Sequence, residues 1–119
     1  MNTKDIGTIG EQKAVKYLVK NGYKIIERNF RKRGFEIDIV AEDSNNILRF
    51  IEVKTIVEGS VEDALFSVEN RNIHRYFLGV DSFLMEYPLY KDNGMSMDVI
   101  LVHGDLIQYY DNVTSCVVI

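Results

Sequence analysis

The sequence predicts a mixed α/β domain in which two helices flank a mixed β-sheet, in the order αβββαβ. Three observations predict this class: an amphipathic stretch near the N-terminus has helical spacing, three β-rich runs follow it, and a second helical pattern precedes a closing hairpin. The chain has 119 residues, of which 27% are charged and 46% hydrophobic, ordinary values for a globular protein. We therefore expect a single domain over residues 1–119.

The first helix is expected over residues 9–21, where apolar side chains recur on one face. That apolar stripe consists of Ala14, Val15, Leu18 and Val19. The dipeptide Asn21-Gly22 then predicts the helix end. Within the helix, Gly10 is a poor helix former and suggests a close approach of the backbone to another element.

Three strands are expected next, over residues 23–30, 35–42 and 47–55, because these runs are rich in β-formers. A basic turn, 31–34, separates the first two, and four turn-forming residues, 43–46, separate the second from the third.

The second half is less regular. Residues 56–67 are expected to be a loop, and residues 68–85 a helix. The apolar positions of that helix are Ile73, Phe77, Val80 and Leu84. Strands over 97–103 and 106–110 would form a closing hairpin, and the tail at 116–119 is either another strand or a loose end.

Composition narrows the class of protein. No apolar run is long enough to span a membrane, and Cys116 is the single cysteine, so a reducing cytoplasm is expected. The net charge is −4, yet residues 1–34 carry nine Lys/Arg against three Asp/Glu. The densest group of positively charged residues, here called the basic cluster, consists of Arg28, Arg31, Lys32 and Arg33. It is either a nucleic-acid contact or a solvated turn.

The hairpin between residues 35–42 and 47–55 carries the candidate chemistry. If its turn centres on Asn45, residues whose numbers sum to 90 face each other, which pairs Asp38 with Glu52 and Glu36 with Lys54. The odd-numbered residues form an apolar face for the core, interrupted by Arg49. That apolar face consists of Ile37, Ile39, Ala41, Ile47, Ile51 and Val53.

Two facing carboxylates lie about 4.5–5.5 Å apart at Cβ and repel each other, so a bridging cation is expected between Asp38 and Glu52. Mg²⁺ or Mn²⁺ suits carboxylate and water oxygens, whereas His74 and His103 lack the spacing of a zinc site. Lys54, two residues along the same face, would contact a phosphate oxygen or orient water. The alternative is a solvated ladder of ordinary ion pairs.

Other residues have simpler explanations. Thr8 and Glu11 match a capping box, with Thr8 as the N-cap, which would account for Glu11 without any chemistry. Tyr87 and Tyr90 could instead mark a surface for protein partners.

Together, these residues resemble the PD-(D/E)XK signature of restriction-endonuclease-like nucleases: Asp38 is followed by Glu52-Val53-Lys54. More specifically, the chain resembles the YraN-like family of predicted endonucleases, related to Holliday-junction resolvases. The matching segments are Gly7–Glu11 with Ala14 and Tyr17-Leu18, Asn21–Tyr23, Arg28–Arg31, Glu36–Ala41, Phe50–Lys54 and Met97–Ile100.

The resemblance implies a restriction-endonuclease-like core that hydrolyses phosphodiester bonds in nucleic acid, DNA rather than RNA, with Mg²⁺ or Mn²⁺. It implies that Asp38, Glu52 and the Val53 carbonyl bind the metal, that Lys54 is the catalytic lysine, and that Glu11 is a further acidic site residue. A homodimer follows by analogy with the resolvases.

Two positions depart from that family, because Phe35 stands where it has Gly and Ile56 where it often has Arg. A non-catalytic nucleic-acid-binding module on the same fold is the alternative function.

Overall fold

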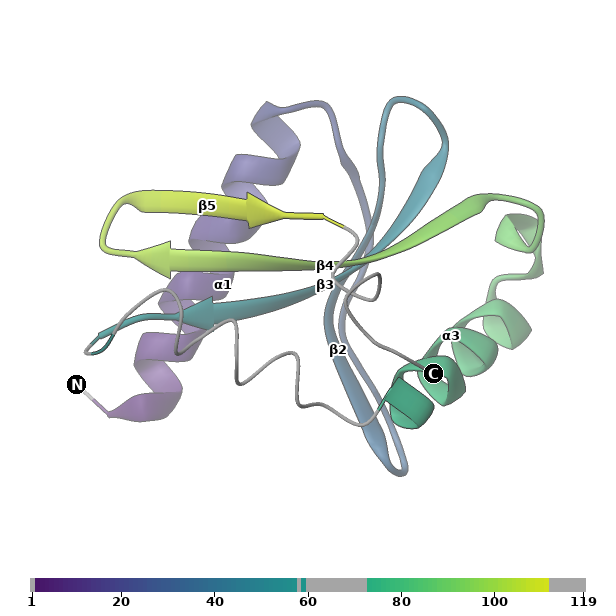
Figure 1. The fold of residues 1–119 in the computed structure, drawn as a ribbon, viewed down its shortest axis with the longest axis horizontal. Coiled ribbons are helices and arrows are strands. Elements are labelled where there is room, and N and C mark those ends of the chain that lie inside the picture. The colour runs from purple at the N-terminus through teal and green to yellow at the C-terminus, as the bar shows by residue number, and fades with distance from the viewer. Residues whose placement is uncertain (1, 58, 60–72, 112–119) are drawn as a thin grey trace.

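The computed structural model describes residues 2–57, 59 and 73–111. The helical elements are α1 (Thr3–Lys20), α3 (Ile73–Glu86) and the 3-10 turn η1 (Pro88–Tyr90). The strands are β1 (Lys24–Lys32), β2 (Phe35–Glu42), β3 (Ile47–Thr55), β4 (Gly94–His103) and β5 (Leu106–Tyr110). Figure 1 shows α1 crossing behind the strands and α3 lying beside the long β2 strand.

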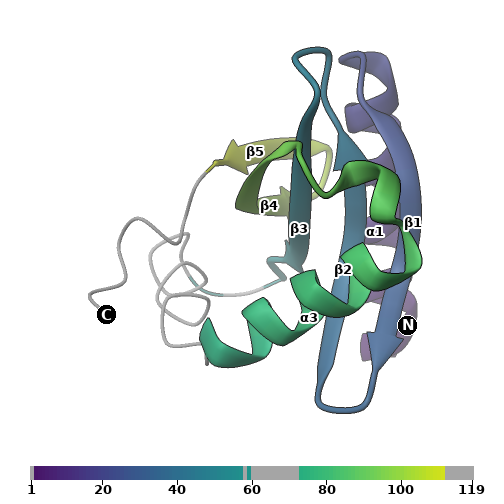
Figure 2. The ribbon, with the colours of Figure 1, turned by 90° about the vertical axis from the view of Figure 1, so that its right-hand side faces the viewer.

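The described strands form one five-stranded sheet in the order β1-β2-β3-β4-β5. Neighbouring strands are antiparallel except β3 and β4, which run parallel, as expected for strands with a helix between them in the chain. The two helices cover opposite faces, and Figure 2 shows α3 in front of the sheet with α1 behind it. The predicted mixed α/β class and the order of elements are confirmed.

Each face of the sheet has its own core. Under α1, the buried cluster consists of Ala14, Leu18, Ile39, Ala41, Ile51, Ile100 and Val102. Under α3, it consists of Phe30, Ile37, Val40, Leu48, Phe50, Val80 and Phe83. β2 and β3 therefore bury both of their faces over this stretch, which places them at the centre of the fold.

The N-terminal helix begins earlier than the sequence predicted. The side chain of Asn2 caps it by accepting a hydrogen bond from the backbone N–H of Asp5 at 2.9 Å. Thr8 lies inside the helix, where its hydroxyl donates to the Lys4 carbonyl at 3.0 Å. The expected capping box of Thr8 with Glu11 is therefore wrong, because a better N-cap lies six residues upstream. Glu11 is left free of that structural role.

The close approach expected at Gly10 is confirmed. A Cβ built on Gly10 would lie 2.0 Å from Oγ1 of Thr55, so only glycine lets α1 pack this tightly on the end of β3. This contact fixes the height of α1 above the strand that carries Glu52 and Lys54.

The β1–β2 hairpin turns its faces over part-way along, and this corrects one expectation. Ile37 was expected on the same face as Ile39, but it packs in the α3 cluster while Ile39 packs under α1. Asn29, in β1 between residues paired with Ile39 and Ile37, has φ 51°. This left-handed residue interrupts the regular alternation of side chains in β1 at the level where the face changes on β2.

Both departures from the resembled family have structural explanations. Phe35 lies against α3 at Gly79, where a Cβ would be 3.0 Å from its ring, so a glycine on the helix accommodates the larger residue on the strand. Ile56 is 7% exposed, and its N–H donates to the Val102 carbonyl at 2.8 Å. It serves the core instead of contacting a phosphate.

The strands at 35–42, 47–55 and 106–110 have the predicted bounds, whereas β1 extends into the expected turn and β4 begins three residues earlier. η1 was not predicted. Tyr87 and Tyr90 are not a free surface pair, because both pack against Phe83. Residues 68–72 of the expected second helix, most of the expected loop at 56–67 and the tail at 116–119 lie outside the described residues.

Neither helix of the described residues combines the length and the apolar composition that crossing a membrane requires.

Candidate active site

The candidate site lies where the pairing of β2 with β3 ends. That pairing runs from Glu42 with Leu48 to Ile39 with Ile51, and each pair sums to 90, so the predicted hairpin register is confirmed over this stretch. Asp38 and Glu52 are the next residues along the two strands. Both carboxylates therefore lie just beyond the last paired residues of β2 and β3.

Asp38 bonds directly to the neighbouring strand. Its Oδ2 accepts a hydrogen bond from the backbone N–H of Val53 at 2.8 Å, and its side chain is half-buried. The N–H and C=O of one strand residue point toward the same neighbouring strand in an antiparallel pair. The Val53 carbonyl therefore faces the Asp38 side of β3, and its oxygen is directed toward the same region as the Asp38 carboxylate.

Glu52 and Lys54 form an ion pair on the face of β3 opposite Val53. The Lys54 Nζ lies 3.4 Å from Oε1 of Glu52, and Glu52 is 8% exposed, whereas the Lys54 side chain is 35% exposed. The sequence argument required a cation to offset repulsion between Asp38 and Glu52. In the structure, the Lys54 ammonium and the Val53 N–H each balance one carboxylate, so repulsion alone does not demand a metal.

Glu36 does not join this group. It was expected to face Lys54, but it lies in the outer part of the β1–β2 hairpin, where its Oε1 pairs with Nη2 of Arg31 at 2.9 Å. The physical reason is that β2 leaves β3 at Asp38 and continues as the partner of β1.

Glu11 projects from α1 toward β1. Its Oε1 accepts a hydrogen bond from the Asn29 side-chain amide at 3.1 Å and lies 3.4 Å from the Arg28 guanidinium. The Glu11 side chain is 13% exposed, so these contacts hold a largely covered carboxylate. Asn29 lies between residues paired with Ile39 and Ile37, which makes Asp38 its neighbour across the hairpin.

The basic cluster is largely neutralised by acids of the same chain. Arg28 pairs with Glu11, Arg31 with Glu36, and Lys32 with Glu86 of α3. Lys32 also lies over the Phe30 ring, 5.4 Å from its centroid. The sequence predicted a concentration of positive charge here, and the structure adds a carboxylate beside three of its four members.

A buried polar network elsewhere explains the one charge on the apolar face. Arg49 lies 3.1 Å from Oδ2 of Asp43 and 3.3 Å from Oδ2 of Asp98, which is fully buried. Ser96 donates to Asp98 at 2.5 Å, and the Tyr109 hydroxyl also bonds to it. Sequence reasoning found Arg49 but not its partners, since they come from a turn and from β4 and β5.

The charges in this network shift each other's pKa. Burial lowers the pKa of the Arg49 guanidinium, but the nearby Asp98 and Asp43 carboxylates outweigh it and the net shift is upward. Burial and the bond to Asp98 raise the pKa of the Tyr109 hydroxyl. Burial raises the pKa of Asp43, while N–H groups of Ile47 and Asn45 and the Arg49 charge lower it, with a net downward shift.

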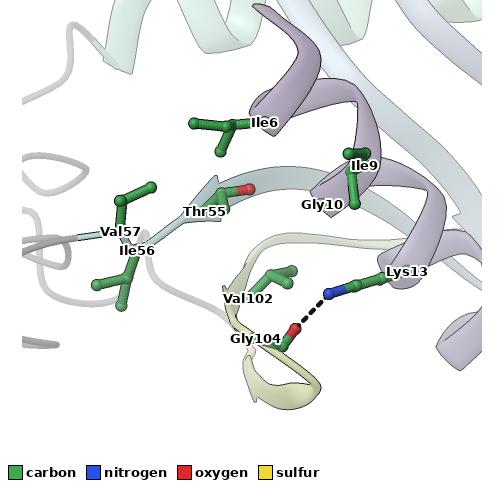
Figure 3. Close-up of a pocket in the computed structure, with 9 residues that line it drawn as sticks. All are labelled: Ile6, Ile9, Gly10, Lys13, Thr55, Ile56, Val57, Val102 and Gly104. Atoms are coloured by element: carbon green, nitrogen blue, oxygen red, sulfur yellow. Dashed lines mark hydrogen bonds between the residues drawn. The ribbon is translucent and has the colours of Figure 1, made fainter. Parts of the chain in front are cut away.

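A groove of about 310 Å³ lies at the Gly10–Thr55 contact (Figure 3). Its lining residues are Ile6, Ile9, Gly10, Lys13, Thr55, Ile56, Val57, Val102 and Gly104. The Lys13 ammonium donates to the Gly104 carbonyl at 2.7 Å and pairs with Asp105 at 3.5 Å. Because no predicted site residue lines this groove, it is separate from the candidate site.

Within the described ranges, no group of three or more His, Cys, Asp or Glu side chains has the arrangement of a metal site. The candidate set contains only two such side chains, Asp38 and Glu52, and its third ligand would be the backbone carbonyl of Val53. The residues that the structure brings together are thus Asp38, Glu52, Val53 and Lys54, with Glu11 held next to Asn29.

The fold and this site define a class: a mixed α/β domain with two carboxylates and a lysine at the end of a central strand pair. The chain belongs to the family described as "Uncharacterised protein family UPF0102", whose model matches residues 10–102. That match includes all four side chains proposed as catalytic, Glu11, Asp38, Glu52 and Lys54.

Relatives of this chain have the same family name. A UPF0102 protein of Fusobacterium nucleatum subsp. nucleatum is 34% identical over 113 residues, covering 95% of this chain and 93% of the relative. One from Aliarcobacter butzleri is 34% identical over 113 residues, covering 94% and 98%. Another, from Trichlorobacter lovleyi, is 60% identical over 50 residues, which are 42% of this chain and 39% of that relative.

Proposed function

We propose that this chain is a metal-dependent nuclease with a restriction-endonuclease-like core that hydrolyses phosphodiester bonds in nucleic acid, DNA rather than RNA. The observation that carries the proposal is the hydrogen bond from the Val53 N–H to Asp38. It ties the carboxylate of β2 to the residue between Glu52 and Lys54 on β3, which supports a site built from these two acids and the lysine.

The donor set fits a hard divalent cation. Asp38 and Glu52 supply carboxylate oxygens, and the Val53 carbonyl, directed to the Asp38 side, supplies a neutral oxygen. Mg²⁺ and Mn²⁺ prefer such oxygen ligands together with water. When bound, the metal would polarise the phosphoryl group and lower the pKa of an attacking water.

The position of Lys54 supports a role in contacting phosphate. Its ammonium is held 3.4 Å from Glu52, while about a third of its side chain is exposed. It therefore places a positive charge at the mouth of the site, where a phosphate oxygen or the attacking water would be bound. The buried carboxylate of Glu52 holds this ammonium by an ion pair.

The test for metal binding does not depend on activity. We expect substoichiometric Mn²⁺ to broaden the amide NMR signals of residues 37–39 and 52–54 more strongly than those of residues 44–46, in the turn at the opposite end of the β2–β3 pair. Asp38→Asn with Glu52→Gln should abolish the effect. Equal broadening in the wild type and the double variant would contradict the proposed metal site.

The test for cutting uses branched, single-stranded and duplex DNA with Mg²⁺ or Mn²⁺. Lys54→Ala should lose the activity, whereas Lys91→Ala, which removes one exposed charge elsewhere, should retain it. Identical background with the wild type and Lys54→Ala on every substrate would rule out cutting as the function of this site.

A non-catalytic nucleic-acid-binding module is the second candidate. It is favoured by the Lys54–Glu52 ion pair, which already neutralises one of the two carboxylates, and by the burial of Ile56 where the resembled family often has Arg. Salt-dependent DNA binding that needs no metal and survives Asp38→Asn would support this module. Absence of salt-sensitive binding would remove both candidates.

A further inference from the structure

Two adjacent residues of β1 bond to the same carboxylate. Arg28 and Asn29 both contact Oε1 of Glu11, at 3.4 and 3.1 Å. Consecutive residues of a regular strand point to opposite faces, so two neighbours cannot normally converge on one atom. The left-handed backbone of Asn29, with φ 51°, breaks the alternation and makes this convergence possible.

Asn29 combines two properties that few residues share. Apart from glycine, asparagine is one of the residues that best tolerates the left-handed region. Unlike glycine, it also brings a side-chain amide that donates to Glu11. The same residue is next to Asp38 across the β1–β2 hairpin, because the flanking pairs are Arg28 with Ile39 and Phe30 with Ile37.

We propose that Asn29 is a positioning residue for the candidate site, which ties the Glu11 carboxylate of α1 to β1 at the position opposite Asp38 of β2. The inference rests on the proposed nuclease function, since Glu11 is a site residue only within it. Asn29 does not touch the reacting atoms. It acts through Glu11, whose 13% exposed side chain is held by this amide and by Arg28.

The discriminating variant is Asn29→Gly, which keeps the left-handed backbone and removes only the amide. Asn46→Gly is the matched control, because Asn46 also has a positive φ, of 62°, but lies at the β2–β3 turn. We expect Asn29→Gly to lower the cleavage rate about 10- to 100-fold, as the loss of an orienting partner does. Asn46→Gly should leave the rate within about twofold of the wild type.

A double-mutant cycle separates positioning from a general structural effect. If Asn29 acts through Glu11, Asn29→Gly causes no further loss in a Glu11→Ala background, which lacks the accepting oxygen. An equal loss in both backgrounds, or an unchanged rate for Asn29→Gly in the wild type, would overturn the inference.

The contact itself is tested without activity. Glu11→Gln should shift the side-chain amide NMR signals of Asn29 and leave those of Asn46 in place. Unmoved Asn29 signals would overturn the positioning role even if the enzyme cuts DNA. Shifted signals in a protein that cuts no substrate would instead remove the proposed function while the contact stands.

Discussion

Replacing Asp98 by Asn tests whether the buried polar network stabilises the fold. Asp98 is fully buried, and its carboxylate meets Nη1 of Arg49 at 3.3 Å, the Ser96 hydroxyl at 2.5 Å and the Tyr109 hydroxyl. The amide keeps the shape of the side chain but removes its charge. Arg49, with a 14% exposed side chain, would then lose one of its two close carboxylate partners.

The size of the effect follows from the burial. Removing one partner of a buried ion pair costs about 3–5 kcal/mol in the free energy of unfolding. Arg49 keeps Asp43 at 3.1 Å, so we expect a loss near the lower end, about 3 kcal/mol. For a domain of this length, that corresponds to a decrease in Tm of about 10 °C.

Urea unfolding of the full chain at pH 7 measures this loss, and Asp111→Asn is the matched control. Asp111 also lies within 4.0 Å of Arg49, but its side chain is 71% exposed, so its removal should cost less than about 0.5 kcal/mol. If Asp98→Asn stays within 0.5 kcal/mol of the wild type, or if both variants lose the same amount, the reasoning from burial is wrong.

Three further predictions follow from the packing and the pKa shifts. In urea unfolding, Gly10→Ala should be less stable than Gly7→Ala by about 1–3 kcal/mol. Both variants gain the same helix propensity, but a Cβ at Gly10 meets Thr55, whereas one at Gly7 meets nothing within 4 Å. Equal stabilities of the two variants would contradict the close contact. The free energy of unfolding should fall above pH 10 by up to about 1.4 kcal/mol per pH unit. The reason is that the unfolded chain releases the Tyr109 proton, whereas the folded chain retains it at a raised pKa. Tyr109→Phe should remove that part of the slope. Below pH 4 the wild type should lose stability as Asp43, whose folded pKa is lowered, takes up a proton, and an unchanged acid slope in Asp43→Asn would show that this carboxylate is not the cause.

The sequence predicted best what local patterns determine. Turn-forming residues at 43–46 and alternating side chains determined the bounds of β2 and β3, and the turn centred on Asn45 gave their register. From that register followed the neighbourhood of Asp38, Glu52 and Lys54. The start of α1 was missed because Thr8 and Glu11 match a capping box in sequence, whereas the cap at Asn2 depends on one side-chain hydrogen bond.

What could not be predicted depends on contacts between distant segments. The side chain of Glu11 has partners on β1, and Asp98 has partners 49 and 11 residues away in the chain. Asn29 lies in the segment Arg28–Arg31 that matches the resembled family, but its role depends on a left-handed backbone that a strand pattern does not reveal. The ion pairs of the basic cluster were missed for the same reason, since Glu86 is supplied by α3.

The carboxylates beside the basic cluster have a consequence for any polyanion that binds there. Three of the four cations already have an acidic partner within the molecule, so the net positive charge facing a polyanion is small and would displace few of its condensed counterions. Affinity at this edge would therefore vary less steeply with ionic strength than its count of positive residues suggests. The shape of the β1–β2 hairpin end, more than the number of basic residues, would then determine which polyanions bind there.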